Sequence, residues 1–175
     1  MKISKIFIPN DSSSLSVGSE ETFLAFSDQL KNESIEIVRT GSRGLFWLEP
    51  LVEFETEFGR VGFKNVSYQE VEKILLELEN HKKYIGLVEE IDFLKKQERV
   101  TFANCGKYDP LSIDDYIKNG GLSGLKKALK FHQSQLIEVI TKSGLRGRGG
   151  VGFPTGVKFK TVLDAEAEKK YIVCN

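Results

Sequence analysis

Six glycines lie within the thirteen residues from Gly144 to Gly156, in the stretch SGLRGRGGVGFPTGVKFK (143–160). The stretch also carries two arginines and two lysines, and no acidic residue. Glycine loses more conformational entropy on folding than any other residue, so a folded chain that keeps six of them needs a compensating interaction. Backbone N–H groups that no Cβ shields, next to cationic side chains, form a site for an anion. We therefore expect an anion-binding loop here, and the alternative is an exposed basic linker.

The spacing of Gly147, Gly149 and Gly152 matches the G-x-G-x-x-G fingerprint of dinucleotide-binding folds. That fingerprint stands between a strand and a helix. Pro154 follows the last glycine closely and opposes a helix that would run through it. The preceding LIEVI (136–140) has the composition of a strand, but its capping signals favour a helix. A dinucleotide fold is therefore only weakly indicated.

A P-loop is indicated even less, because Lys158 follows no glycine directly and no Ser or Thr follows it. The physical basis of both motifs still applies. Arg148 and Lys158 can neutralise a phosphate. Phe153 and Pro154 can offer an apolar surface to a ring. A phosphate together with a ring indicates a nucleotide or a flavin.

The first 80 residues alternate between strand-like and helix-like segments. Ser19 and Ser67 are each followed by apolar residues at helical spacing, which predicts two capped helices. The order β-α-β, β-hairpin, α predicts a small α/β or α+β unit. Strands are expected within residues 3–8, 35–40, 51–56 and 59–66.

We predict three parts: a domain at 1–80, a helical linker at 81–98 and a second domain at 99–175. The second domain should contain a helix capped by Ser112 and, at its end, a buried strand at 171–173. Chains rarely stop on an apolar strand, so we expect the front part of a longer protein.

Composition excludes several classes of protein. The formal net charge is zero, which gives no overall basic field for nucleic acid. No apolar run approaches the roughly 20 residues of a membrane span. The two cysteines, Cys105 and Cys174, form neither a disulfide framework nor a CxxC metal pair, so reduced thiols and a cytoplasmic location are expected.

The stretch SGLRGRGGVGFPTGVKF (143–159) resembles the signature of the FMN- and NADH-binding 51-kDa-type subunit of NADH dehydrogenases, including respiratory complex I. The same signature occurs in the diaphorase subunit of NAD-reducing hydrogenases and in the beta subunit of NAD-dependent formate dehydrogenases. The segments 104–121 and 171–175 also resemble parts of this family. The resemblance implies that residues 99–175 begin an FMN-binding α/β domain.

The stretch RTGSRGLFWLEPLVEFET (39–56) resembles the N-terminal extension of the formate dehydrogenase beta subunits. That extension is similar to the thioredoxin-like ferredoxin domain, which elsewhere binds a [2Fe–2S] cluster through four cysteines. No cysteine precedes Cys105. The resemblance therefore implies a thioredoxin-like domain without a cluster, serving either as a docking module for a partner subunit or only as a structural relic.

The resemblance also implies a set of cofactor-binding residues, and neither a catalytic side chain nor a metal ligand. The glycines and Arg148 would line FMN, Lys158 would reach both cofactors, and Phe153 would stack on NADH. Thr161 stands where the family often has a second aromatic residue. The [4Fe–4S] ligands of the family lie beyond the last residue. The implied set is Gly147, Arg148, Gly149, Gly150, Phe153, Lys158 and Asn175.

The implied function is hydride exchange between NAD(H) and FMN, with single electrons passing to iron–sulfur clusters. The implied partners are a small [2Fe–2S] subunit and a catalytic iron–sulfur subunit. The stretch 41–53 favours formate dehydrogenase over complex I and the hydrogenases. An alternative from a different functional class is a non-catalytic assembly or binding protein that retained the loop.

The remaining candidate residues have structural interpretations. Trp47 is expected in a core or at a subunit interface. Cys105 and Cys174 are expected as buried thiols. His81 and His132 are expected on the surface. Asp114 and Asp115 are expected to begin a helix.

Overall fold

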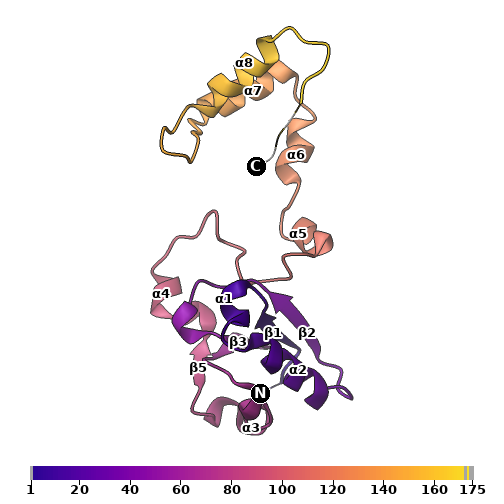
Figure 1. Cartoon of the computed structure of the whole chain (residues 1–175), viewed down its shortest axis with the longest axis vertical. Coiled ribbons are helices and arrows are strands. Elements are labelled where there is room, and N and C mark those ends of the chain that lie inside the picture. Colours follow the sequence, from indigo (N-terminus) through magenta and orange to yellow (C-terminus); the bar gives the residue numbers. More distant parts are fainter. Residues whose placement is uncertain (1, 172, 174–175) are drawn as a thin grey trace. The chain divides into compact units, whose positions relative to one another are not determined.

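The computed structural model describes residues 2–171 and 173 of the 175-residue chain (Figure 1). The chain divides into two compact units between Asn119 and Gly120. This division lies inside the segment 99–175. The domain boundaries at residues 80 and 98 stay predictions.

The first unit is a mixed α/β fold around a five-stranded sheet, and its regular elements follow the predicted order. Its helices and strands are β1 (Lys5–Pro9), α1 (Ser12–Leu15), α2 (Ser19–Gln29), β2 (Glu36–Thr40), β3 (Val52–Thr56), β4 (Gly59–Phe63), α3 (Val71–Glu77), β5 (Tyr84–Leu87), α4 (Asp92–Lys95) and α5 (Ile113–Lys118).

The strand order in the sheet is β2-β1-β3-β4-β5. The first two strands pair in parallel through the crossover helix α2, and the remaining pairs are antiparallel. A parallel β-α-β unit joined to a β-hairpin and a helix is the thioredoxin-like arrangement that the sequence resemblance implies. The expected strands and the two expected helices are confirmed, but their expected caps are not. Gly18 is the N-cap of α2, and α3 follows a 3-10 turn at whose start Ser67 makes no capping hydrogen bond.

Alternation along the central strands gives the sheet two buried faces. Ile6, Phe54 and Val61 are register partners on one face, where α2 and α3 cover them. Phe26 of α2 meets Phe54 edge to face at 5.9 Å between ring centroids. Fully burying an aromatic or branched side chain contributes roughly 1.5–3 kcal/mol, so this face stabilises the unit.

The opposite face carries a buried ion pair. Arg43 donates from Nε and Nη2 to the two carboxylate oxygens of Glu53, at 2.8 and 2.7 Å, and from Nη1 to Glu89. Burial alone would lower the pKa of Arg43, but hydrogen bonds and charge from Glu53 and Glu89 raise it. Arg60 stacks on Phe7 and lies 3.7 Å from Glu53.

Part of the segment expected as a helical linker is instead a strand. Residues Tyr84–Leu87 form β5, which pairs antiparallel with β4 after a register shift. Gly86 takes φ of +76°, which an L side chain rarely adopts and which does not suit a helix. Only Asp92–Lys95 within this segment forms a short α-helix.

The expectations for His81 and Cys105 are wrong, and one of the two locations expected for Trp47 is excluded. His81 is 3% exposed and not on the surface, and it is the C-cap residue of the 3-10 turn that follows α3. Cys105 is exposed, because it lies in an irregular segment with turns and no strand. Trp47 is 56% exposed and so is not a core residue, although it contacts Phe93 edge to face. Cys174 lies outside the described residues.

The second unit is helical wherever it has regular structure. Its helices are α6 (Ser123–Ala128), α7 (Gln133–Lys142) and α8 (Thr155–Asp164). His132, with Gln135, caps α7. Tyr171 and Val173 are in no strand, and Ile172 between them is outside the part of the chain that is described.

The start of α5 agrees with the prediction from the sequence. The Ser112 hydroxyl accepts from the Asp115 N–H, and the two aspartates fill the first turn of α5. His132 is exposed, as expected. Among the helices of the described residues, none is long and apolar enough to cross a membrane.

Candidate functional site

The segment 144–155, called the glycine loop below, connects α7 to α8 and closes on itself. The Gly147 N–H donates to the Phe153 carbonyl at 2.8 Å. The Thr155 N–H donates to the Leu145 carbonyl at 2.9 Å. Arg146 and Pro154 form an antiparallel bridge between these two bonds. The loop is therefore a short hairpin whose stem is 145–147 paired with 153–155, and whose turn is 148–152.

Pro154 does not break the helix that follows. It is the N-cap residue of α8, with φ of −61° and an extended ψ of 121°. The helix starts one residue later, at Thr155. The missing N–H of Pro154 therefore removes no hydrogen bond within the helix. The LIEVI segment before the loop is helical and belongs to α7. The strand that the dinucleotide fingerprint requires is therefore absent from 133–142.

Three glycines near the loop have a structural reason to be glycine. Gly144 and Gly152 adopt φ of +68° and +57°, where an L side chain is strained. Gly156 is buried where α8 crosses α7, and a Cβ there would lie 2.9 Å from the Thr141 Cα. The fold itself explains these three positions.

Gly149 and Gly150 have no such reason. A Cβ on either would meet no atom within 4 Å, and neither has a positive φ. Across residues 2–171, the N–H groups of Arg148, Gly149 and Gly150 find no protein acceptor. Successive free N–H groups without shielding side chains form a concavity that suits an anion. The turn of the hairpin therefore leaves room for a group that the chain itself does not supply.

Among the predicted side chains, those of Phe153 and Lys158 lie near each other. The Lys158 Nζ is 5.9 Å from the centroid of the Phe153 ring, whose side chain is 44% exposed. Gly147 bonds to the backbone of the same phenylalanine. Arg148 is exposed, and among the described residues its side chain makes no hydrogen bond or ion pair. Asn175 lies outside the described residues.

Sequence reasoning missed one residue of this site. The Arg146 Nε donates to the Gly152 carbonyl at 2.7 Å, across the turn. The signal that would reveal it is its position, since Arg146 lies two residues before the turn and faces Pro154 in the stem. Its role depends on loop closure, which glycine spacing alone does not predict.

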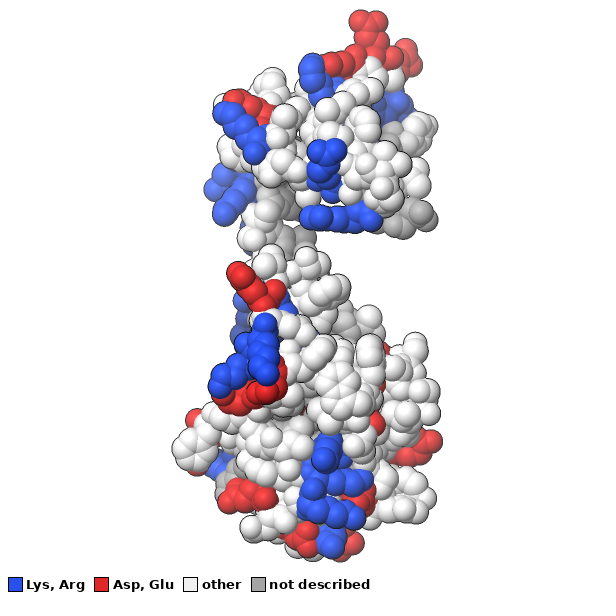
Figure 2. Space-filling view, turned by 90° about the vertical axis from the view of Figure 1, so that its left-hand side faces the viewer, with Lys and Arg blue, Asp and Glu red and all other residues white. Residues whose placement is uncertain are grey.

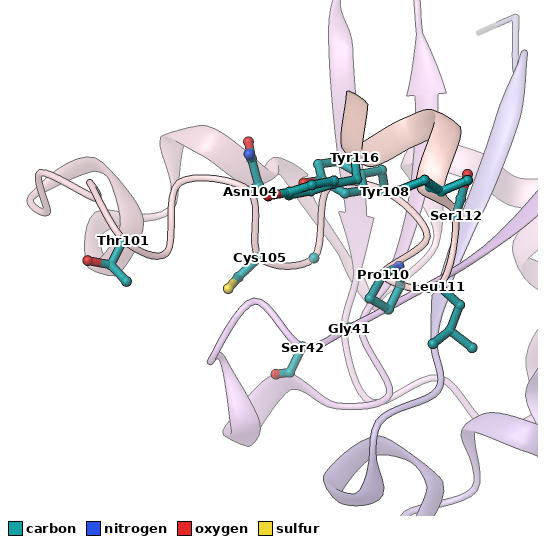
Figure 3. A pocket seen from close by; sticks show the side chains of 12 residues that line it. Gly41, Ser42, Thr101, Asn104, Cys105, Tyr108, Pro110, Leu111, Ser112 and Tyr116 are labelled. Carbon is teal, nitrogen blue, oxygen red and sulfur yellow. The ribbon is translucent and has the colours of Figure 1, made fainter. Parts of the chain in front are cut away.

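A separate pocket of about 520 Å³ lies in the first unit (Figure 3). Figure 3 shows Tyr108 and Tyr116 on one side, with Ser42 across from them and Cys105 between. None of the predicted cofactor-binding residues lines it. In the described part of the chain, no three His, Cys, Asp or Glu side chains are grouped to hold a metal ion. The glycine loop therefore remains the candidate site.

Charge supports the glycine loop as the anion site. From Gly120 to Asn175 the sequence has ten Lys and Arg and four Asp and Glu, a net charge of +6. From Met1 to Asn119 it has fifteen and twenty-one, a net charge of −6. Lys and Arg outnumber acidic residues on the upper part of the view in Figure 2. The zero net charge of the whole chain therefore conceals a basic unit.

The chain is similar in part to subunits of NAD(P)-linked redox complexes. It is 51% identical over 81 residues to the NADP-reducing hydrogenase subunit HndC of Solidesulfovibrio fructosivorans, covering 46% of this chain and 16% of that subunit. It is 47% identical over 64 residues to a NADH-quinone oxidoreductase subunit of Aquifex aeolicus, covering 37% and 15%. It is 51% identical over 51 residues to the alpha subunit of the NAD-reducing hydrogenase HoxS of Cupriavidus necator, covering 29% and 8%.

The chain thus matches less than a fifth of the length of these relatives. No family model matches it. Among solved structures, the wild-type thioredoxin-like [2Fe-2S] ferredoxin of Aquifex aeolicus aligns with 45% of this chain and 86% of its own, at 19% identity and a TM-score of 0.38. The strand order of the first unit, and not this alignment, defines the fold described above.

Proposed function

We propose that the chain is part of a flavoprotein oxidoreductase subunit that exchanges hydride between NAD(H) and FMN. The observation that carries the proposal is the turn of the glycine loop, where Gly149 and Gly150 are open and the N–H groups of 148–150 have no protein acceptor. The similarity to hydrogenase and NADH-quinone oxidoreductase subunits supports it. Glycines that the fold does not require are explained by close approach of a ligand.

The residues of the loop fit the parts of a flavin or nucleotide. The free N–H groups of the turn suit the oxygens of a phosphate, and Arg148 can pair with the same group through two donors. The exposed Phe153 ring suits the face of a planar ring. The Lys158 Nζ lies 5.9 Å from the centroid of the Phe153 ring and can add a second positive charge beside that ring. Asn175, outside the described residues, remains part of the proposed set.

The side chains of this loop bind and orient, and none acts as acid, base or nucleophile. FMN supplies the conversion between two-electron hydride transfer and single-electron transfer. Arg148 and Lys158 place its charged end, and Phe153 orients a ring at the hydride-transfer side. Glycine backbone lets the cofactor approach without a Cβ in the way.

In this proposal the iron–sulfur clusters are bound by residues other than those that the structure describes. The chain has two cysteines, far fewer than a [4Fe–4S] cluster and a [2Fe–2S] cluster would need. Electrons would pass to clusters elsewhere in the complex, held by a small [2Fe–2S] subunit and a catalytic iron–sulfur subunit. The first unit, with its exposed Trp47 and Phe46, would dock onto such a partner. A cytoplasmic location remains part of the proposal.

The finer assignment concerns the electron donor. Residues 39–56 resemble the formate dehydrogenase beta subunit, and on that basis we keep formate dehydrogenase as the finer proposal. The relatives compared above are instead hydrogenase and NADH-quinone oxidoreductase subunits. Purifying the protein with the subunits it binds, and then measuring NAD reduction with formate and with hydrogen, distinguishes these donors. Reduction by hydrogen alone would overturn the formate assignment.

The central test is an FMN titration followed by quenching of flavin fluorescence, on the 175-residue chain and on a longer protein that continues past Asn175. We expect saturable binding by at least one form. The double variant Arg148→Ala with Lys158→Ala should lose it. The matched control is Lys142→Ala with Lys160→Ala, which removes two charges of the same unit outside the loop. Absence of binding by both forms would overturn the flavin proposal and favour a non-catalytic binding protein.

A further inference from the structure

We propose that the two arginines of the glycine loop have different roles. Arg146 is a positioning residue that holds the loop closed, and Arg148 is the arginine that meets the phosphate of the ligand. The part concerning Arg148 rests on the proposed flavin function, because Arg148 needs an anionic ligand to act on. The part concerning Arg146 rests on contacts within the loop.

Arg146 is committed to the loop backbone. Its Nε donates to the Gly152 carbonyl at 2.7 Å, and its own backbone bridges Pro154. Gly152 is the last residue of the turn and adopts a left-handed backbone conformation, with φ of +57°. The side chain thus ties the first strand of the stem to the last residue of the turn. It supplements the bond from the Gly147 N–H to the Phe153 carbonyl, one residue along.

Arg148 is in the opposite situation. It lies inside the turn, is exposed, and has no hydrogen-bond or ion-pair partner in the residues that the structure describes. Its backbone N–H begins the run of free N–H groups at 148–150. A guanidinium next to three free N–H groups has donors to offer a phosphate and none committed elsewhere. The same residue type at 146 and 148 therefore serves two different contacts.

The covalent structure of the side chains provides a test of this division. In glutamine the amide nitrogen lies four bonds from Cα, as Nε does in arginine, so Arg146→Gln keeps an N–H donor and removes the charge. In lysine a methylene occupies that position and the Nζ donor lies one bond farther from Cα, so Arg146→Lys keeps the charge and displaces the donor. A positioning role at 146 is therefore retained by Gln, weakened by Lys and lost with Ala. A charge role at 148 is retained by Lys and lost by Gln.

The first measurement uses no ligand. Hydrogen exchange of the Gly147 amide, which donates to Phe153, reports closure of the loop. We expect exchange roughly two- to tenfold faster in Arg146→Ala, which corresponds to the loss of one hydrogen bond, and a smaller increase in Arg146→Lys. Exchange should stay at the wild-type rate in Arg146→Gln and in all Arg148 variants. Exchange in Arg146→Ala equal to wild type would overturn the positioning role.

The second measurement is FMN affinity, in the form of the protein that binds it. Arg146→Lys should weaken binding severalfold and Arg146→Gln should bind close to wild type. Arg148→Gln should weaken binding roughly tenfold or more, as expected for a charge-assisted hydrogen bond, and Arg148→Lys should lose less. The reverse order at either position would overturn the division. If no form binds FMN, the flavin proposal and the role of Arg148 fail together, while the exchange result still decides the role of Arg146.

Discussion

The two units of the chain differ in where their stability comes from. The first unit buries a cluster of aromatic and branched side chains on one face of its sheet and an ion pair on the other. In the described part of the second unit, Gly156 is the only buried residue, and large apolar side chains such as Leu129, Phe159 and Val162 are exposed. The first unit is therefore stabilised by its own core, whereas the described part of the second presents the glycine loop on helices that lack one.

The largest expected effect tests this difference at two phenylalanines. Phe54→Ala removes a fully buried ring at the centre of the first unit and should lower its free energy of unfolding by about 3–5 kcal/mol. Phe159→Ala removes a ring that is 47% exposed and should change stability by less than about 0.5 kcal/mol. Urea unfolding followed by Trp47 fluorescence measures the first unit, since Trp47 is the only tryptophan. Helical circular dichroism measures the second.

Comparable losses in the two variants would contradict the comparison. They would mean that Phe159 is buried in solution against something that the described residues do not include. Phe159→Leu is the matched control, because it keeps an apolar side chain at an exposed position.

The next effect concerns the buried ion pair. Arg43→Ala leaves the Glu53 carboxylate, 3% exposed, without its bidentate partner, so we expect a loss of about 3 kcal/mol or more in the same urea experiment. The double variant Arg43→Met with Glu53→Leu replaces both charges and should lose less than Arg43→Ala, because no unpaired charge stays buried. A double variant less stable than Arg43→Ala would contradict this explanation, and the difference between the double variant and the wild type gives the net contribution of the pair.

How much of the fold could be predicted from the sequence depends on whether a feature is defined by a local sequence pattern or by tertiary contacts. Strand β3 alternates apolar and polar residues, and β1 and β4 are short segments of β-branched or aromatic residues next to Pro9 or Gly59, so local patterns are sufficient to predict them. Strand β5 is four residues long, contains Gly86 and pairs with a register shift, so only its neighbour β4 defines it. The burial of His81 and the exposure of Cys105 likewise depend on tertiary contacts.

The same distinction applies to the candidate site. Glycine density and local charge predicted where the loop lies, because both are properties of the sequence itself. The closure of the loop by Arg146 and Gly152 joins residues six apart through a turn, and no periodic pattern records it. The division between glycines that the fold requires and those that it leaves open is also visible only from φ angles and neighbouring atoms.

A smaller effect concerns the pH dependence of the first unit. Burial alone would raise the pKa of Glu70, but hydrogen bonds from Lys83 and Ser67 lower it to about 2, from an ordinary value of 4.5. Since the folded pKa is the lower one, this stabilisation is present above pH 4.5 and is lost as the pH falls toward 2. Both side chains are partly exposed, so we expect it to be no more than about 1 kcal/mol.

The measurement is the free energy of unfolding between about pH 7 and pH 2.5, in the wild type and in Glu70→Gln. The variant should show a shallower decline in this range. Glu72→Gln is the matched control, because it removes an acidic residue two positions away. Equal slopes for the wild type and Glu70→Gln would show that Lys83 does not hold this carboxylate in solution.

The smallest expected change in stability separates two glycines of the second unit. Gly149→Ala places a Cβ where no atom lies within 4 Å, so helical circular dichroism and thermal unfolding should stay within about 0.5 kcal/mol of wild type. Gly156→Ala places a Cβ 2.9 Å from the Thr141 Cα and should loosen the crossing of α7 and α8. If position 149 is a glycine because a ligand approaches its backbone closely, Gly149→Ala should nevertheless weaken FMN binding. Unchanged affinity would mean that the open turn is not where the cofactor approaches.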